Sequence, residues 1–475
     1  MNKPHPSKTG SDGHPLEEHE KVNFRLIYSR TYSWSTIAVA RNRTPEERMR
    51  AWSLLTTGLL TTVVLISTSW ARSGKEYKFR GGLKDGVQPN SALVSDGAGN
   101  FYGTTTFGGL SCGFEQCGTV FRLSRGPNGK WTESLIYEFK GGTDGEHPYA
   151  NLTLDPLGNL YGTTSEGGGC GSCGTVFELS PSQGGTWTET IIYTFKGDTD
   201  GGYPQSGVIF DAAGSLYGTT VLSGGCNPYC GGTVYKLTPS QGDSWSKSTL
   251  FTFPGSVNGQ VFLSAVVFDS VGSLYGTTYR GGANSAGTVF QLTPNQDGTW
   301  TEADIYSFTD GLDGGYPSGG VIFDTAGNLY GEASEGGSFA CPMTGCGVIF
   351  KLTPDLGNWT FNVVHTFDGL NGSKGDLPLG GLALDSAGNL YGTTEGGGGS
   401  DACGTSGCGT IFELSSEGGG TLTFKMIGAF NNTDGAAPDS GVIVDTAGNL
   451  YGTTSAGGSS PHCESCGVVF TLSPQ

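Results

Sequence analysis

The hydrophobic and polar positions of this chain repeat with a period of about 58 residues over most of its length. The heptapeptide GNLYGTT, or a close variant, occurs seven times, with its tyrosine at Tyr102, Tyr161, Tyr217, Tyr275, Tyr330, Tyr391 and Tyr451. Each copy holds short apolar or alternating runs separated by turns rich in Gly, Pro and Asn, which is typical of strands. Repeats of this period indicate a solenoid, an array or a propeller.

Each copy predicts four strands. Strand one is a short apolar run that ends in Asp, as in 207–211, and strand two is the LYGTT segment. A Gly-rich loop leads to strand three, as in 174–179, and a Pro/Gly turn leads to strand four, as in 187–195. Four strands in each unit, with no helical pattern, match the blades of a β-propeller.

The Asp that ends strand one is present in every copy, at Asp96, Asp155, Asp211, Asp269, Asp324, Asp385 and Asp445. A residue needed in every copy is expected to build the blade, so we predict that its carboxylate accepts N–H groups of the following turn. The repeated tyrosines are predicted to pack between blades, although rows of aromatic residues can also stack on sugars.

The two ends of the repeat region predict a closed ring. The last copy stops at Gln475 after its third strand, whereas the segment 76–82 matches strand four of the first copy and its exit, 136–142. The N-terminal strand would complete the last blade, and closure removes the exposed edges of an open array. We predict an all-β, seven-bladed propeller with a ring of residues 76–475, within a domain of residues 72–475.

The N-terminal region is a separate part of the chain. Residues 1–50 are polar and are predicted to be disordered or not translated, whereas 51–71 contain no charge. If translation begins at Met49, this stretch is a signal peptide cleaved after Ala71. If translation begins at Met1, it is a membrane anchor with a basic flank. Both alternatives export the propeller and predict an extracellular or cell-surface location, with membrane contact only through an uncleaved 51–71.

Composition narrows the function classes. Glycine accounts for 84 of 475 residues without a Gly-X-Y period, which excludes collagen, and 35% hydrophobic residues argue against general disorder. The formal charge is −18, and residues 72–475 hold only 16 Lys/Arg against 37 Asp/Glu. This acidic balance argues against nucleic acid and anionic polymers as partners. We expect a monomer.

The cysteines form six local pairs between strands two and three: Cys112 with Cys117, Cys170 with Cys173, Cys226 with Cys230, Cys341 with Cys346, Cys403 with Cys408, and Cys463 with Cys466. An even number in an exported chain predicts disulfides. Zinc is the alternative for Cys-x-x-Cys, but neighbouring pairs would lie far apart around a ring. We therefore predict no metal site and no cofactor from the cysteines. The copy around Tyr275 lacks a pair.

The loops between strands two and three and those between blades are expected on one face. The second group carries a recurring Asp-Gly-x-x-Pro sequence that begins at Asp85, Asp144, Asp200, Asp313 and Asp434. A ring of these carboxylates could bind calcium or a cationic ligand. Asp-Gly is also a common turn sequence, and we favour this structural interpretation over a binding site.

Departures from the repeat are the ligand-binding candidates, because blade construction does not explain them. They are Arg280 in the cysteine-free loop, Glu332 in place of the first Thr of GTT, and Glu166, Glu335 and Glu395 after strand two. Two carboxylates at a suitable separation would permit glycoside hydrolysis. No catalytic residue is assigned, and the chain has no nucleophile-elbow motif for a Ser-His-Asp enzyme.

The full repeat carries a family resemblance. The segment Asp385–Thr394, a Gly-rich loop and the strand 409–414 resemble the GloVer tandem repeat of bacterial exported proteins. The resemblance covers residues 76–475 and implies a propeller-like surface protein. Members often end in a sorting anchor, whereas this chain ends at Gln475 without a hydrophobic tail.

These observations predict a binding or interaction module whose partner is a glycan or a surface protein. The alternatives are a propeller-type glycoside hydrolase or polysaccharide lyase, and a purely structural surface protein.

Overall fold

The description below concerns the unit Thr68–Gln475 of the computed structural model. The described residues are 70–72, 76–81, 85–109, 112, 116–171, 173–222, 231–242, 244–254, 264–338, 340–341, 345–369, 375–416, 422–458, 463 and 465–474. The predictions for residues 1–69 lie outside these ranges, and so does the predicted disulfide between Cys226 and Cys230.

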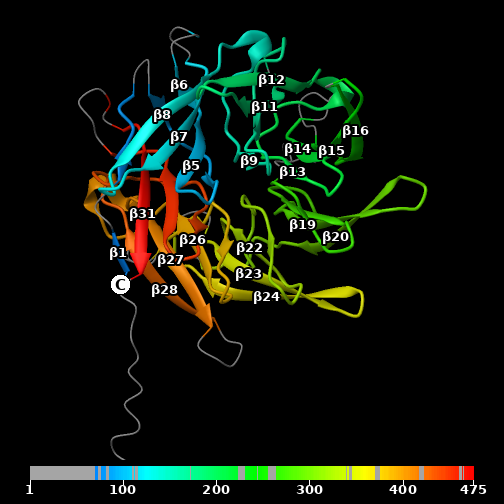
Figure 1. Ribbon diagram of the computed structural model, residues 1–475. Helices are drawn as coiled ribbons and strands as arrows, with labels where there is room; N and C mark the ends of the chain where they lie inside the picture. Colours follow the sequence, from blue (N-terminus) through cyan, green and yellow to red (C-terminus); the bar gives the residue numbers. More distant parts are fainter. Residues whose placement is uncertain are drawn as a thin grey trace, which may run out of the picture. The chain divides into compact units, whose positions relative to one another are not determined.

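Seven antiparallel sheets surround a common centre and form the blades of a propeller (Figure 1). The first three blades are β4 (Val94–Ser95), β5 (Asn100–Thr105), β7 (Thr119–Arg125) and β8 (Trp131–Glu138); β9 (Thr153–Leu154), β10 (Leu160–Thr164), β11 (Thr175–Pro181) and β12 (Trp187–Thr194); and β13 (Ile209–Phe210), β14 (Leu216–Thr220), β15 (Thr233–Pro239) and β16 (Trp245–Thr252). Blades four and five are β17 (Val267–Phe268), β18 (Leu274–Thr278), β19 (Thr288–Pro294) and β20 (Trp300–Ser307); and β21 (Ile322–Phe323), β22 (Leu329–Ala333), β23 (Val348–Asp355) and β24 (Asn358–Thr366). Blade six is β25 (Ala383–Leu384), β26 (Leu390–Thr394), β27 (Thr410–Ser416) and β28 (Leu422–Ala429).

Blade seven is completed by the N-terminal segment, as the ends of the repeat predict. It contains β29 (Ile443–Val444), β30 (Leu450–Thr454) and β31 (Val468–Pro474), and both β1 (Trp70–Arg72) and β2 (Tyr77–Lys78) pair antiparallel with β31. The seven-bladed, ring-closed propeller is therefore confirmed. The first closing strand, β1, begins at Trp70 and so includes the last two residues of the apolar segment 51–71.

Short elements join the blades. They are β3 (Gly86–Val87), which pairs with β6 (Phe107–Gly108), and three 3-10 helices, η3 (Gly142–Asp144), η4 (Asp198–Asp200) and η6 (Asp401–Ser406).

The Asp after strand one organises the turn to strand two, as predicted. In blade two, Asp155 Oδ1 accepts the N–H groups of Leu157 and Asn159 at 2.8 Å, and Oδ2 accepts from the Asn159 amide. The Tyr161 hydroxyl also donates to Oδ2, at 3.3 Å. The backbone bonds to Oδ1 and the tyrosine bond to Oδ2 recur in the other blades, so this Asp builds the fold.

The hydrophobic core consists of seven clusters, each shared by two neighbouring blades. In each seam, a buried Phe after strand four meets an aromatic ring of the next blade's strand three edge-to-face, a favourable geometry for aromatic pairs. Phe139 packs on Phe177 with ring centroids 5.1 Å apart, and the closing seam pairs Phe79 with Phe121 at the same distance. The N-terminal segment thus supplies the seventh seam with the same contact as a regular blade.

This packing explains the Gly of LYGTT. A Cβ on Gly162 would lie 2.6 Å from the Phe177 ring, because that ring lies directly over strand two. The corresponding glycine of every other blade meets the same obstruction from its own strand-three aromatic side chain.

The outer part of the seams differs in charge between blades. In blade three, the Lys247 ammonium lies 3.2 Å from the Asp200 carboxylate of blade two. Glu189 occupies the corresponding position in blade two. Burial, and then the neighbouring Asp144 carboxylate, raise the pKa of Glu189 to about 7. Glu189 Oε1 has no hydrogen-bond partner within the described part of the chain.

Glu189→Lys is expected to stabilise the propeller by about 1 kcal/mol, because it replaces a like-charge contact by the ion pair already present one blade further on. Urea denaturation followed by tryptophan fluorescence measures the change. Glu189→Gln, which removes only the repulsion, should give a smaller gain, and Lys247→Glu should destabilise. A loss of stability in Glu189→Lys would contradict the equivalence of the two seams.

Candidate functional site

The loops between blades and the loops between strands two and three meet on one face, as predicted. Bridges join Glu146 to Glu166 in blade two and Gly315 to Glu335 in blade five. The β3–β6 pair is the same connection in blade one. The ligand-binding candidates Glu166 and Glu335, which follow strand two, therefore lie beside the inter-blade loops.

The residue before the loop proline has a left-handed backbone in six blades. These residues are Gln88, His147, Tyr203, Tyr316, Leu377 and Ala437, with φ between 51° and 57°. Such a conformation is strained for a non-glycine residue and persists only where its surroundings hold it. Its N–H donates to the preceding blade, as from His147 to the Cys117 carbonyl at 2.9 Å. Its carbonyl accepts from its own blade, as from the Ser165 N–H at 3.1 Å.

The disulfide loops also help to hold the inter-blade loop of the next blade in place. The predicted pairs Cys112–Cys117, Cys170–Cys173, Cys341–Cys346, Cys403–Cys408 and Cys463–Cys466 are disulfides. In each of the five, the carbonyl of the second cysteine holds the left-handed residue of the following blade. In the cysteine-free blade, Ala286 replaces the second cysteine, and its carbonyl accepts the Tyr316 N–H at 2.7 Å.

The sixth predicted disulfide belongs to blade three. It would join Cys226 and Cys230, and both cysteines lie outside the described residues. This pairing therefore stays a prediction, whereas the other five are confirmed.

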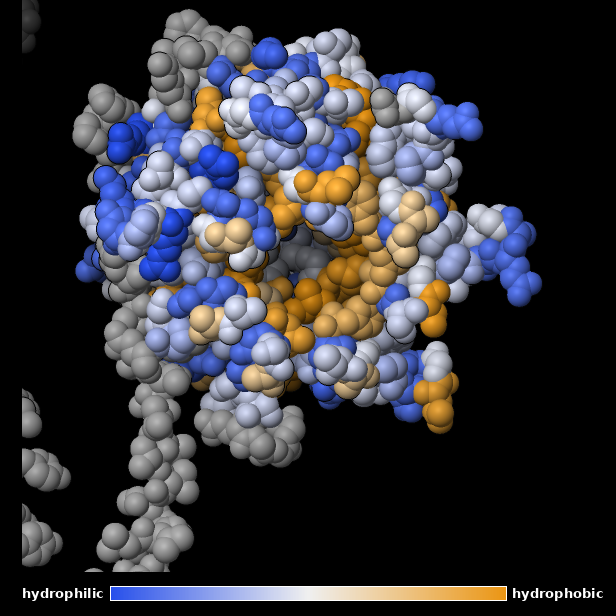
Figure 2. Space-filling view, in the orientation of Figure 1, coloured by the Kyte–Doolittle hydropathy of each residue, from blue (hydrophilic) through white to orange (hydrophobic). Residues whose placement is uncertain are grey.

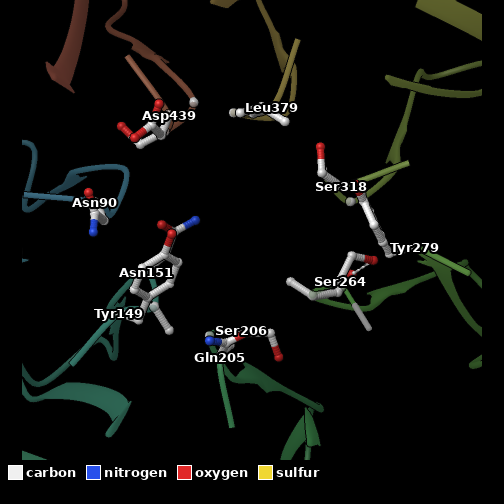
Figure 3. Close-up of a pocket in the computed structure, with 18 of the residues that line it drawn as sticks. Asn90, Tyr149, Asn151, Gln205, Ser206, Ser264, Tyr279, Ser318, Leu379 and Asp439 are labelled. Atoms are coloured by element: carbon white, nitrogen blue, oxygen red, sulfur yellow. Dashed lines mark hydrogen bonds between the residues drawn. The ribbon is translucent and has the colours of Figure 1, made fainter. Parts of the chain in front are cut away.

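The centre of the ring holds a cavity of about 440 Å³. Figure 2 shows one face of the ring hollowed at its centre, and Figure 3 shows the side chains around the cavity. The residue that follows the loop proline lines the cavity in six blades: Asn90, Tyr149, Gln205, Ser318, Leu379 and Asp439. The proline recurs in these blades, whereas the residue after it is different in each one.

The Asp-Gly loop carboxylates are bonded within their own loops. Asp144 accepts from the Tyr137 hydroxyl and from the Lys140 N–H, both at 2.7 Å. Asp85, Asp200 and Asp313 accept in the same way from a tyrosine and a backbone N–H. These contacts confirm the interpretation of the Asp-Gly sequence as a turn.

Arg280 and Glu335 are brought together in a cluster between blades four and five. The Arg280 guanidinium lies 5.9 Å from the ring of Tyr279 and 5.4 Å from that of Tyr316. The Tyr279 hydroxyl donates to Glu335 at 3.4 Å. Burial, with a smaller contribution from Asp310, raises the pKa of Glu335. Because Tyr279 also lines the cavity, this cluster reaches the central site.

Glu166 and Glu395 lie elsewhere on the same face. Glu166 is 3.6 Å from the His147 imidazole. Burial raises the pKa of Glu395, and its negative charge in turn contributes to raising the pKa of Asp439 and of Tyr149. Glu395 is thus close to two residues of the cavity wall.

Glu332 lies inside the wall between blades five and six and is fully buried. In six seams, the Thr at this position donates to a backbone carbonyl of the next blade, as from Thr163 to Ser206 at 3.0 Å. Glu332 instead accepts the Gly381 N–H at 2.8 Å. Its Oε1 has no partner among the described residues, and a Cβ on Gly392 would lie 2.9 Å from that oxygen.

Sequence reasoning missed the cavity residues that follow the proline. The signal was present, because an aligned set of repeats shows a proline in six of the seven copies, each time followed by a different residue. Reasoning from departures from the repeat found Glu332, which is buried. It also found Arg280, Glu335 and Glu395, which lie near the cavity.

Two further properties of the described residues bear on the site. They contain no group of three or more His, Cys, Asp or Glu side chains arranged to hold a metal ion. None of their helices has the length and apolar character needed to cross a membrane.

Comparison with known families agrees with this architecture. The model of the Gloeobacter/Verrucomicrobia repeat matches residues 61–229 and 208–460. The chain belongs to this repeat family. The GloVer resemblance seen in the sequence is therefore confirmed. No curated protein is significantly similar to the chain.

Three solved structures match the chain at 10–12% identity. An ancestral GH74 enzyme has a TM-score of 0.52 and 12% identity, over 86% of this chain and 51% of that one. A protein of unknown function from Dyadobacter fermentans DSM 18053 has a TM-score of 0.42 and 12% identity, over 86% of this chain and all of the other. A PL25 ulvan lyase has a TM-score of 0.46 and 10% identity, over 84% and 96% of the two chains.

Glu332 is expected to make stability depend on pH. Burial raises the pKa of Glu332 from 4.5 to about 8, so the folded protein retains a proton that the unfolded chain releases. Its contribution to stability is thus complete below about pH 4.5 and is lost as pH rises towards 8. Glu332→Gln removes this titration and should stabilise the protein at pH 8 by on the order of 2 kcal/mol.

Chemical denaturation of both proteins across this pH range measures the effect. The advantage of Glu332→Gln should shrink as the pH approaches 4.5. Glu332→Thr, which restores the residue of the other six blades, serves as a second variant. A stability difference that stays constant with pH would show that the carboxyl does not titrate in the folded ring.

Proposed function

We propose that this GloVer propeller is an exported binding protein that holds a carbohydrate at the mouth of its central cavity. The single observation that supports this function most is the contrast within the inter-blade loops. A proline recurs in six of the seven blades and sets the backbone, whereas the next residue differs in each of these six and lines the cavity. Variation that the fold does not require is expected where a ring contacts its ligand.

The chemistry of the lining supports a carbohydrate. Tyr149 leaves 39% of its surface exposed, whereas the seven tyrosines of strand two are buried. An exposed tyrosine offers a flat apolar ring with a polar end, which suits a sugar face. The amides of Asn90, Asn151 and Gln205 and the hydroxyl of Ser318 also line the cavity. These groups can both donate and accept hydrogen bonds, as sugar hydroxyls require.

The rigidity of the rim supports a binding role. Six of the lining residues follow a proline, and the residue before that proline is hydrogen-bonded to two blades. Side chains fixed in this way lose little freedom when a ligand binds, which favours affinity. The five disulfides support export, because such bonds persist in oxidising compartments.

Tyr149→Ala is expected to weaken carbohydrate binding by about tenfold or more, because it removes the exposed ring from the rim. The protein, prepared with its disulfides intact, is tested against a panel of oligosaccharides and cell-wall fragments by calorimetry, with product formation followed in the same samples. Saturable binding without product is the expected result.

Leu157→Ala is the matched control, because Leu157 is 83% exposed and lies in the turn between β9 and β10, at the other end of the same blade. It should bind as the unmodified protein does. Absence of binding to every carbohydrate would refute the proposed function. Release of product would favour the hydrolase or lyase alternative.

A further inference from the structure

One side of the cavity mouth combines a carboxylate with the exposed aromatic ring. We propose that this side, formed by Asp439 and Tyr149, binds an ammonium group, and that the carbohydrate ligand therefore contains amino-sugar units. The inference rests on the proposed function and names the class of carbohydrate. Figure 3 shows Asp439, Asn90 and Tyr149 in succession around this side of the opening.

The charge of the lining favours a cation. Asp439 is the one acidic residue among the described residues that line the cavity, and these include no Lys, Arg or His. The whole chain has a formal charge of −18, which attracts cations and repels anions over longer distances. A uronate or a phosphorylated sugar would meet repulsion here, whereas an amino sugar would meet attraction.

The two oxygens of Asp439 have different surroundings. Oδ2 accepts a hydrogen bond from the Ser455 hydroxyl at 2.6 Å, which fixes the orientation of the carboxylate. Oδ1 is shielded from solvent and has no hydrogen-bond partner among the residues that the structure describes. Because no donor offsets the charge of this oxygen, the carboxylate attracts a cation in the adjacent cavity through its charge rather than through a hydrogen bond to Oδ1.

The surroundings of Tyr149 also favour a cation. The ring is accessible from the cavity, and the negative charges of Asp439 and Glu395 both contribute to raising the pKa of its hydroxyl, after burial. An aromatic face beside carboxylates is a common arrangement for binding ammonium groups, through the ring quadrupole and direct charge attraction.

The other charged groups of this face do not oppose the inference. The cation of the candidate cluster, Arg280, stacks on Tyr279 and Tyr316 in the seam of blades four and five. Its charge acts on Glu335 and lowers the pKa of that carboxyl, which offsets part of the effect of burial. Glu395, the acid that acts on Asp439, adds negative charge to the ammonium side.

The test compares a glucosamine oligosaccharide with the N-acetylglucosamine oligosaccharide of the same length. The two probes share the sugar backbone and differ in the charge of the amino group. At neutral pH, we expect calorimetry to give an affinity at least about tenfold higher for the glucosamine oligosaccharide. Asp439→Asn should abolish that preference. Asp297→Asn removes the same charge from a fully exposed turn and should preserve it.

The pH dependence gives a second readout. Burial raises the pKa of Asp439 to about 6, so its negative charge is lost as pH falls through that value. Glucosamine binding should therefore weaken below pH 6, although the ligand amine gains charge there, and Asp439→Asn should lack this decline.

Three results would overturn the inference. Equal affinity for both oligosaccharides, dependent on Tyr149, would refute the ammonium site and leave carbohydrate binding at the cavity intact. A glucosamine preference that survives in Asp439→Asn would refute the assignment to this carboxylate. Binding of neither probe would refute the amino-sugar inference, and only the wider panel would then decide the proposed function.

Discussion

The edge-to-face contact between blades is the interaction on which the rest of the molecule depends. A blade of this family cannot bury its own hydrophobic surface, because the Phe after its fourth strand packs on the third strand of the next blade. The glycine of LYGTT allows that contact by leaving room for the ring over strand two. A seam is therefore complete only when a next blade exists, which favours a closed ring. Phe79 meets this requirement at the last seam, from the opposite end of the chain.

The same seams determine how the loops of one face are held. The second cysteine of a disulfide loop is buried in the seam, and its carbonyl bonds to the left-handed residue of the following blade. Strain in the loop backbone is thus balanced by contacts with two blades, and the proline that follows fixes the direction of the next side chain. Ala286 makes the bond without a disulfide, so the seam needs the carbonyl and a small buried side chain rather than the sulfur bridge itself.

The sequence was sufficient to predict the blades, because their residues obey local rules that each copy repeats. The turn that Asp155 organises and the disulfide Cys170–Cys173 both depend on contacts within one blade. The cavity could not be found in this way, since Asn90 and Asp439 are more than 300 residues apart and meet only through ring closure. Glu332 illustrates the same difficulty, because its burial depends on glycines of the next blade.

In this propeller, the residues that hold the blades together and the residues that face the central axis occupy different positions of each repeat. The residues at the centre of each seam, such as the Phe after strand four and the glycine of LYGTT, are alike in every copy, because each blade both gives and receives the same contact. Residues that face the axis contact no equivalent partner, so each blade can contribute a different side chain there without weakening the ring. The cavity is therefore asymmetric although the scaffold is regular, with a carboxylate and an aromatic ring on one side and serines on another. An asymmetric rim on a rigid ring can orient a ligand as well as hold it, and this property supports a binding role more than a purely structural one.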